Sequence, residues 1–459
     1  MPTTRRAFLR NAAATTAVLG FPTIVPASVF GPDAPSNRIN IGAIGVGRIS
    51  RGHDMPGVWQ YSSGPRNNRI LAVADLYAPR VESAKVLVNE VYAKQTGKAY
   101  NGTVGYTDYR ELLANKDIDA VLISAPDHQH ARLVVAAVRA GKDAYVQKPA
   151  SLTIEEGRAM VTHVQATKQI VQVGSQQRSW KQFARAVELV RNGRIGKVTH
   201  VEVGLPGDPA GGKRDPMPVP AGFEYDAWLG STMEVPYTLD RVMPTSGFDR
   251  PGWLRMEQFG AGMITGWGAH HVDTAHWGMD TEHTGPIEVW GNAQFPDHGL
   301  WDVHGDFLTH ALYANGMTMD ISGAFPNGIK WYGTEGSLFV QRDTGTTPTA
   351  SLTDIQVKIE PLIASNPKIL ASVIGPNEWH PYTADDQHGN WLDCIRSRKQ
   401  PTAPAEIGHR ACSTCLVHSI AMHNPNRHLH WDPVTERFPQ YDPANAALSR
   451  PQRPPYQVA

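Results

Sequence analysis

Residues 38–50 read RINIGAIGVGRIS, and this stretch decides the fold. Its first half alternates like a short β-strand, and its second half follows the pattern Gly-x-Gly-x-x-Ser. Gly45 permits a tight turn, Gly47 lets a bound group approach the backbone, and Ser50 is small enough for the next helix to pack on the strand. That helix would point its N-terminal amides at a phosphate. The stretch therefore predicts a strand, a phosphate-binding loop and a helix.

A second predicted strand, RILAVAD at residues 69–75, ends in an acid. An acid at this position hydrogen-bonds the adenosine ribose of a dinucleotide and repels a 2′-phosphate, so Asp75 favours NAD over NADP. The alternative is that Asp75 caps the following helix. The spacing from Gly45 to Asp75 is longer than usual, and a predicted loop at residues 61–68 accounts for it.

Strands and helices go on alternating after Asp75. The pattern predicts helices at 109–114 and 131–140, buried strands at 120–124 and 144–147, and a turn at 125–130. Such alternation is typical of a doubly wound parallel sheet, whose ligands bind at the carboxyl ends of the strands. Lys148 follows the last of these strands, where a nicotinamide ring would lie. A cationic ring would lower its pKa and make it an acid–base group. The alternative is a surface lysine in a turn.

The N-terminus resembles an export signal. Residues 4–10 read TRRAFLR, and a short, alanine-rich, weakly apolar stretch follows. Arg5 and Arg6 in this setting predict a twin-arginine signal peptide at residues 1–34, and therefore a periplasmic protein that meets the twin-arginine translocation machinery. The alternative is a basic start to a cytosolic protein. Because this pathway carries folded proteins, a cofactor would be loaded before export and held tightly.

The composition excludes several classes of protein. The chain has 459 residues, of which 41% are hydrophobic and 19% charged, which is ordinary for two or three globular domains. The 43 basic and 43 acidic residues cancel, so no field attracts nucleic acid. No apolar run is long enough for a membrane anchor. Three cysteines make no disulfide framework, and Cys412 and Cys415 are predicted to be core residues.

Several motifs in order resemble the glucose–fructose oxidoreductase, inositol dehydrogenase and rhizopine-catabolism (Gfo/Idh/MocA) family. They are the Gly45 loop, the turn ending at His130, Gln147-Lys148-Pro149, residues 173–178, residues 183–197, Gly268 to Asp273 and residues 333–336. The resemblance implies an N-terminal Rossmann domain and a C-terminal α/β domain with a large, open, mainly antiparallel sheet. That sheet often carries the oligomer contact, so a homodimer or homotetramer is expected.

The resemblance also implies cofactor contacts. On this sequence they fall on Gly45, Gly47, Arg48, Ile49, Asp75, Pro126, His130 and Gln147. Two family acids are missing. The Glu-Lys-Pro motif falls on Gln147, Lys148 and Pro149, and the Asp-x-Gly-x-His-x-x-Asp motif begins at Gly266. Gln147 can still bind a ribose, whereas Gly266 cannot take a proton.

A histidine-rich segment supplies the remaining catalytic candidates. His270 and Asp273 are three residues apart and would share a helix face, so Asp273 is predicted to orient His270 as a general base beside Lys148. His271 would point elsewhere and is left open between the core and the substrate. His276 is expected in the core. A metal site in this segment would lack a separate third ligand, so no metal is predicted.

Residues 204–259 form a long segment rich in Pro, Gly, Trp and Arg. Aromatic faces and arginine forks suit a sugar, although the segment as a whole could equally wrap a neighbouring subunit. The predicted substrate contacts are Arg178, Trp253, Arg255 and His271.

The predicted organisation is a signal peptide (1–34), an NAD-binding domain (35–175), a substrate and oligomerisation domain (176–430) and an extended tail (431–459). Three functions follow in order of preference. The first is an oxidoreductase that acts on a sugar or polyol hydroxyl, with tightly bound NAD and with Lys148 and His270 as acid–base groups. The second is a redox-neutral glycoside lyase or hydrolase that works through a transient keto sugar. The third is a non-catalytic sugar-binding protein, which the missing acids at positions 147 and 266 would suit.

Overall fold

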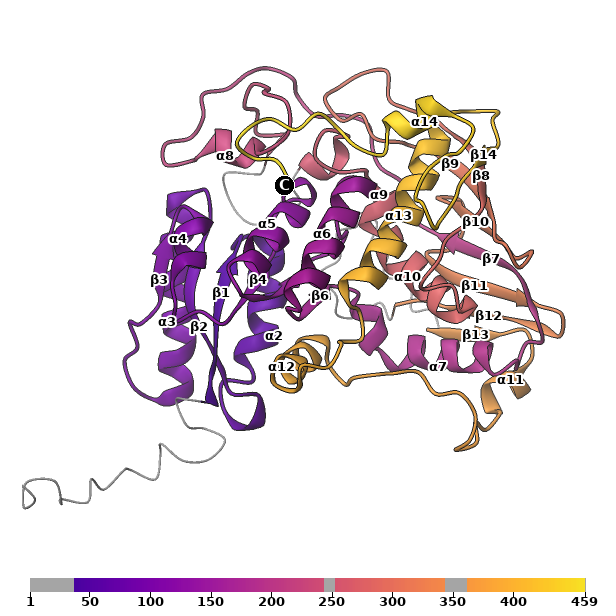
Figure 1. Ribbon diagram of the computed structural model, residues 1–459, viewed down its shortest axis with the longest axis horizontal. Coiled ribbons are helices and arrows are strands. Elements are labelled where there is room, and N and C mark those ends of the chain that lie inside the picture. The colour runs from indigo at the N-terminus through magenta and orange to yellow at the C-terminus, as the bar shows by residue number, and fades with distance from the viewer. Residues whose placement is uncertain (1–36, 243–251, 343–360, 459) are drawn as a thin grey trace, which may run out of the picture.

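The computed structural model describes residues 37–242, 252–342 and 361–458. Figure 1 shows two β-sheets side by side, one from the N-terminal third of the chain and one from its middle, with C-terminal helices returning between them. The predicted signal peptide, with Arg5 and Arg6, lies outside the described residues. Within the described ranges, no helix combines the length and the apolar character needed to cross a bilayer.

The first sheet has six parallel strands in the order β3-β2-β1-β4-β5-β6. Its central strands are short apolar runs because helices cover both faces. The strands are β1 (Ile39–Ile44), β2 (Asn68–Ala74), β3 (Val104–Tyr106), β4 (Ala120–Ile123), β5 (Asp143–Val146) and β6 (Val171–Val173). The order reverses between β1 and β4, which is where a doubly wound sheet binds its ligand.

The helical elements of this domain are η3 (Ser50–Asp54), α2 (Met55–Trp59), η4 (Gly64–Arg66), α3 (Ala78–Thr96), α4 (Tyr109–Ala114), α5 (Asp127–Arg139) and α6 (Ile154–Thr167). The prediction that α5 starts at Ala131 was wrong, since the helix starts at Asp127. Pro126 is extended at the N-cap, and Asp127 places an acid in the first turn, which favours a helix start here. His128 and His130 therefore lie on a helix.

The second sheet has eight strands in the order β13-β12-β11-β7-β10-β9-β8-β14. Strands β7 and β10 pair in parallel, and the other neighbours are antiparallel. The strands are β7 (Val198–Gly204), β8 (Glu288–Ala293), β9 (Phe307–Leu312), β10 (Thr318–Ser322), β11 (Gly328–Gly333), β12 (Gly336–Val340), β13 (Leu362–Ala364) and β14 (Leu429–His430). The two sheets confirm the predicted fold class.

The helical elements of the C-terminal part are η5 (Gln176–Ser179), α7 (Lys181–Arg191), α8 (Tyr225–Leu229), η6 (Gly252–Arg255), α9 (Met263–Gly266), α10 (Gly268–Met279), α11 (Pro367–Ala371), α12 (Gln387–Ser397), α13 (Ala405–Met422) and α14 (Asp442–Ala446). Helices α7, α10 and α13 pack on the second sheet. Helix α13 also contacts α6, so it ties the two sheets together.

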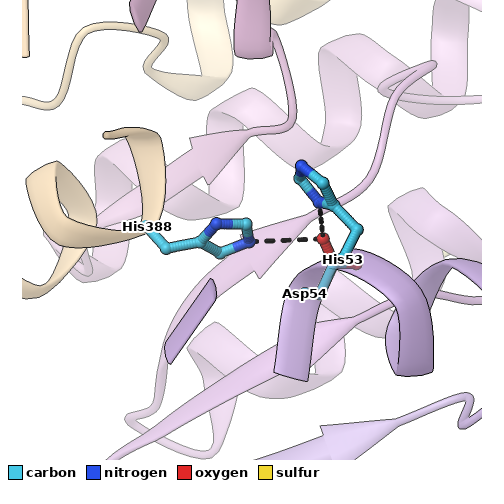
Figure 2. A group of neighbouring side chains, drawn as sticks. All are labelled: His53, Asp54 and His388. Carbon is cyan, nitrogen blue, oxygen red and sulfur yellow. Dashed lines mark hydrogen bonds and ion pairs between the residues drawn. The ribbon is translucent and has the colours of Figure 1, made fainter. Parts of the chain in front are cut away.

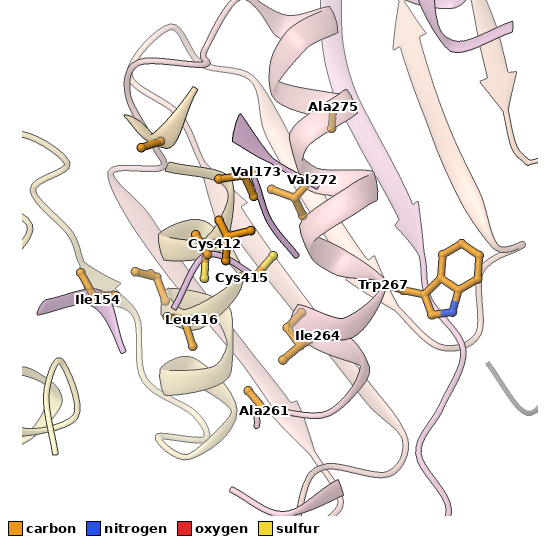
Figure 3. Close-up of a cluster of buried hydrophobic side chains, with 14 of the residues drawn as sticks. Ile154, Val173, Ala261, Ile264, Trp267, Val272, Ala275, Cys412, Cys415 and Leu416 are labelled. Carbon is orange, nitrogen blue, oxygen red and sulfur yellow. The ribbon is translucent and has the colours of Figure 1, made fainter. Parts of the chain in front are cut away.

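An apolar cluster fills the space between α13, α10 and the edge of the first sheet. Figure 3 shows Cys412 and Cys415 in this cluster beside Val173 and Val272. Both thiols are fully buried and neither forms a disulfide, so the prediction that they are core residues is confirmed. Burial raises the pKa of Cys412 to about 11, which makes it a poor nucleophile.

The C-terminal residues return to the first domain in two places. Helix α12 packs against α2 and β5, and Trp391 is fully buried in the core around β1. The final residues run back across the molecule, where Arg453 pairs with Asp226 at the start of α8. The predicted extended arm thus includes the short helix α14 and ends against the N-terminal half of the protein (Figure 1).

Candidate cofactor and substrate pocket

One cavity of about 460 Å³ lies at the carboxyl ends of β1, β4 and β5 and opens toward α8, η6 and α9. Its size is in the range of small-molecule sites. Among its lining residues are eleven of the predicted site residues: Gly45, Gly47, Arg48, Ile49, Asp75, Pro126, His130, Gln147, Lys148, Trp253 and His270. The four that do not line it are Arg178, Arg255, His271 and Asp273.

The glycine loop has the geometry of a phosphate cradle. Gly45 has φ +78°, and a Cβ there would lie 2.6 Å from the Ser124 carbonyl oxygen, so no other residue fits without a shift. Gly47 lines the cavity, and the nearest atom to an added Cβ would be the Arg80 guanidinium at 3.6 Å. The backbone of the loop is therefore open to a bound group. These residues fit a dinucleotide, whose pyrophosphate would lie along the loop.

Asp75 fastens the same loop. One carboxylate oxygen accepts from the backbone N–H of Val46 (2.9 Å) and the other from that of Tyr77 (3.1 Å). Helix α3 begins at Ala78 with Tyr77 at the N-cap, so Asp75 is not itself the cap residue. Its oxygens keep further lone pairs, and its side chain lines the cavity.

Gln147 and Lys148 directly follow β5 and lie at the other part of the cavity. The Lys148 ammonium donates to the Gly266 carbonyl oxygen of α9 (2.8 Å) and so joins the two domains. The Gln147 side-chain amide donates to Asp54 (2.8 Å). His130 lies below this turn, with Nδ1 2.7 Å from the Pro149 carbonyl oxygen. Burial lowers the pKa of His130 to about 4, so it holds the turn as a neutral ring.

His270 faces the cavity from α10 but lacks its predicted partner. Its Nδ1 has no hydrogen-bond partner among the described residues. Burial, followed by the charges of Arg342 and Lys148, lowers its pKa well below the usual value. His270 is therefore neutral at physiological pH and a weak base.

The predicted His270–Asp273 pair was wrong because a stronger partner takes the carboxylate. Asp273 accepts two hydrogen bonds from the Arg178 guanidinium (2.7 and 2.8 Å), and all of these atoms are buried. A bidentate guanidinium binds a carboxylate more strongly than a neutral imidazole does. Glu282 contacts the same guanidinium at 2.8 Å. Arg178 and Asp273 therefore form a structural ion pair, and Arg178 is not placed to touch a substrate in the cavity.

Two further predicted substrate residues also lie in the core. The Arg255 guanidinium packs 4.5 Å from the Trp301 ring centre. His271 is held by Asn327 (2.8 Å) and by the Gln177 amide (3.1 Å), and burial lowers its pKa to about 3. His276, expected in the core, is buried against the Tyr313 hydroxyl (2.8 Å).

Among the cavity residues that sequence reasoning missed are His53, Asp127, Arg342 and Tyr456. Asp127 is 4% exposed, and burial raises its pKa to about 7 against the opposing charge of Lys148. The Pro-Asp step at a helix start could have drawn attention to it. Tyr456 comes from the C-terminal tail, and nothing in its local sequence indicates that the tail returns to the cavity.

Figure 2 shows a cluster of His53, Asp54 and His388, in which Asp54 and His388 are buried and His53 is partly exposed. The two imidazoles contact one Asp54 oxygen at 2.8 and 3.2 Å. Their three ligand atoms lie within 4.8 Å of one another, which meets the simplest condition for a metal site. The carboxylate already accepts four hydrogen bonds, from these histidines, Gln147 and Ser124, so the cluster is satisfied by hydrogen bonding alone.

Comparisons with known proteins agree with this fold. Residues 39–175 match the family model described as oxidoreductase family, NAD-binding Rossmann fold, and residues 378–458 match the same family's C-terminal alpha/beta domain. An uncharacterized oxidoreductase of Bacillus subtilis is 26% identical over 76% of this chain and 91% of its own length. An inositol 2-dehydrogenase of Rhizobium meliloti is 32% identical over 36% of this chain, and the alignment spans 44% of that enzyme.

Solved structures share the fold at low identity. An aldose–aldose oxidoreductase from Caulobacter crescentus has a TM-score of 0.57 and 17% identity, with 86% of this chain and 99% of that one covered. A levoglucosan dehydrogenase in complex with NADH and levoglucosan has a TM-score of 0.56 and 17% identity, with 88% of this chain and all of that one covered. The two family-model matches and the inositol dehydrogenase relatives support the membership of this chain in the Gfo/Idh/MocA family of NAD-binding oxidoreductases.

Proposed function

We propose that this protein oxidises a hydroxyl group of a sugar or polyol with an NAD that stays bound. The observation that carries the proposal is the arrangement of this cavity. The phosphate cradle at Gly45 and the ribose-binding acid Asp75 lie in one part of it, and Lys148 and His270 meet in the other. Because Lys148 comes from the first domain and His270 from the second, only the assembled fold brings them together.

The chain's own groups can hold the reacting hydroxyl. The nicotinamide, when bound, supplies the hydride acceptor. The contact with Gly266 holds the Lys148 ammonium at the domain boundary, where it can also donate to a substrate oxygen. His270, neutral and without a partner at Nδ1 among the described residues, offers that oxygen a second hydrogen bond. The proton of the substrate hydroxyl must pass to a basic group in this part of the cavity as the hydride leaves.

Asp75 supports the choice of NAD over NADP. Its carboxylate is fixed by two backbone N–H groups and lines the cavity where the adenosine ribose would lie. A 2′-phosphate would meet this negative charge at close range. We therefore expect the protein to exclude NADP.

The contacts of the C-terminal tail support the proposal that the cofactor does not exchange. Tyr456 lines the cavity, its hydroxyl donates to Asp226 (2.7 Å), and its ring lies 5.2 Å from the Arg132 guanidinium. Arg453 also binds Asp226. The tail and α8 thus hold each other across the cofactor end of the cavity. Since export by the predicted signal delivers the protein to the periplasm, a retained cofactor would be reoxidised there by a second substrate in a ping-pong cycle.

The test uses protein purified with its cofactor. A panel of sugars and polyols is added, and reduction of the bound NAD is followed at 340 nm. We expect Lys148→Ala to lower the rate of reduction by about 10²- to 10⁴-fold and to keep the bound nucleotide. Lys116→Ala, an exposed lysine of the same domain, serves as the control. Full activity in Lys148→Ala would contradict the proposal, and sugar binding without any reduction would favour a non-catalytic binding protein.

A redox-neutral glycoside lyase or hydrolase is the second candidate. A glycosyl hydrolase family 109 protein of Shewanella is 29% identical over 43% of this chain and 45% of its own length. In this reaction oxidation at C3 acidifies the neighbouring C–H, the C1 group leaves, water adds and the sugar is reduced again. Release of the leaving group from a chromogenic glycoside without net NADH would favour it.

We also propose that the chain forms a homodimer or homotetramer through the second sheet. Leu308 and Ile363 are large, exposed apolar residues on its strands, and exposed apolar surface is typical of contact faces. Light scattering on the purified protein tests this, and a monomeric mass at micromolar concentration would contradict it.

A further inference from the structure

His53 and Asp54 follow the glycine loop in a π-helical turn, η3. Such turns are frequently found at functional sites. Asp54 is fully buried, whereas the His53 side chain is 26% exposed and lines the cavity. The pair therefore connects a charge inside the protein with the space that a ligand would occupy.

The carboxylate of Asp54 is held in place from all sides. One oxygen accepts from Gln147 (2.8 Å) and contacts His53 Nδ1 (2.8 Å) and His388 Nε2 (3.2 Å), and the other accepts from the Ser124 hydroxyl (2.6 Å). Burial by itself would raise the pKa of Asp54, but the hydrogen bonds from His388 and His53 outweigh it and keep the group ionised. Gln147 is neutral, so the negative charge beside the end of β5 comes from Asp54.

The contact with Asp54 decides the tautomer of His53. Because Nδ1 donates its proton to the carboxylate, the neutral ring carries its lone pair on Nε2. Figure 2 shows that this nitrogen points away from both Asp54 and His388. It has no hydrogen-bond partner among the described residues, and the ring lines the cavity with Lys148 and His270.

His53 and His270, two of the histidines that line this cavity, have opposite surroundings. Burial lowers the pKa of His270 most, and the charges of Arg342 and Lys148, followed by His271 and His53, lower it further. Burial also lowers the pKa of His53, but the hydrogen bond to Asp54 and the charges of Asp54 and Asp386 together outweigh it, so the pKa is raised overall. A proton released in the cavity is therefore more stable on His53 than on His270.

We propose that His53 and Asp54 are the acid–base pair of this cavity, the role that the sequence assigns to His270 and Asp273. This inference rests on the proposed function and names its proton acceptor. The substrate O–H bond breaks and its proton goes to His53 Nε2, while the electron pair forms the carbonyl as the hydride leaves carbon for the nicotinamide. The Asp54 carboxylate stabilises the resulting imidazolium, and Lys148 and His270 hold the substrate oxygen.

The first experiment needs no substrate. Carbethoxylation of His53 by diethyl pyrocarbonate is measured by peptide mass spectrometry across pH, because only the neutral ring reacts. We expect His53 to react at Nε2 with a pKa above the usual 6.5, and Asp54→Asn to move that pKa downward by about one unit or more. An unreactive His53, or a pKa that Asp54→Asn leaves unchanged, would overturn the pair even if no substrate is found. Should Asp54→Asn fail to fold, His388→Ala, which removes one donor to Asp54, is titrated in its place. The carboxylate then binds His53 more strongly and should raise the pKa of His53, and an unchanged pKa would overturn the pair.

The second experiment uses the loaded enzyme and a substrate found by the sugar panel. The single-turnover rate of NAD reduction should fall at low pH, where His53 is protonated. His53→Gln should lower the rate by about 10²- to 10⁴-fold and remove this pH dependence, without loss of bound nucleotide. His380→Gln, outside the cavity, is the control. Retention of the acidic limb in His53→Gln together with its loss in His270→Gln would reassign the base to His270.

One equivalent of zinc in the purified protein, lost in His388→Gln, would instead make the cluster a metal site and overturn the proposal.

Discussion

Replacement of Asp273 by asparagine separates a structural from a catalytic role for this residue. Asp273→Asn removes the anion that binds the Arg178 guanidinium through two hydrogen bonds of 2.7 and 2.8 Å. Arg178 is 3% and Asp273 1% exposed, and removing one partner of a buried pair typically costs about 3–5 kcal/mol. Glu282 stays 2.8 Å from Arg178, so we expect a loss near the lower end, about 3 kcal/mol.

The assay is urea unfolding combined with activity measured per folded molecule. Asp273→Asn should unfold at lower urea, whereas its folded fraction should keep a rate within about threefold of wild type, because Asp273 does not line the cavity. The matched control is Asp280→Asn, whose carboxylate pairs with Arg191 at 2.6 Å but is 71% exposed, and whose loss should cost less than about 1 kcal/mol. An Asp273→Asn protein of normal stability with a hundredfold lower rate of turnover would refute this reasoning. It would restore the prediction that Asp273 orients His270.

Three further predictions concern the tail, the pH dependence and the signal. Tyr456→Ala loses the hydrogen bond to Asp226 and should release bound nucleotide about five- to tenfold faster, measured by nucleotide fluorescence; an unchanged rate would contradict a role for the tail. Burial raises the pKa of Glu156 to about 7, so the folded protein keeps a proton that the unfolded chain loses near pH 4.5. Its contribution to stability is therefore lost as the pH rises through this window, and Glu156→Gln should narrow the difference between the urea midpoints at pH 5 and pH 8; an undiminished difference would assign it to other groups. Arg5→Lys combined with Arg6→Lys should keep the protein in the cytoplasm, as measured by cell fractionation. Normal export of this variant would refute the signal assignment.

The first domain was predictable because its determinants are local. The strand before Gly45, the glycine pair and the acid at Asp75 lie within forty residues, and each forces a conformation or a position at the sheet edge. The position of Lys148 follows from the same logic, since the carboxyl end of a parallel strand is where such sheets bind their ligands. The start of α5 was misplaced because alternation alone does not tell where a helix begins after Pro126.

The acid–base pair was not predictable from spacing. His270 and Asp273 share a helix face, but Arg178, 95 residues earlier in the chain, takes the carboxylate. His53 and Asp54 are neighbours in sequence, and neighbours on a regular α-helix point about 100° apart. The π-helical turn brings the His53 ring to the Asp54 carboxylate, and His388 comes from the far end of the chain. These contacts depend on tertiary packing that no local pattern contains.

The most direct test of the account is to identify what the protein carries. The protein is purified from the cells that produce it, dialysed extensively and denatured, and any released nucleotide is identified and counted by mass spectrometry. The account predicts about one equivalent of NAD or NADH and no NADP, with the bound nucleotide changing its absorbance at 340 nm when a substrate sugar is added. Absence of nucleotide, with none taken up on incubation with NAD, would contradict the assignment of the glycine loop and Asp75 and with it the proposed oxidoreductase.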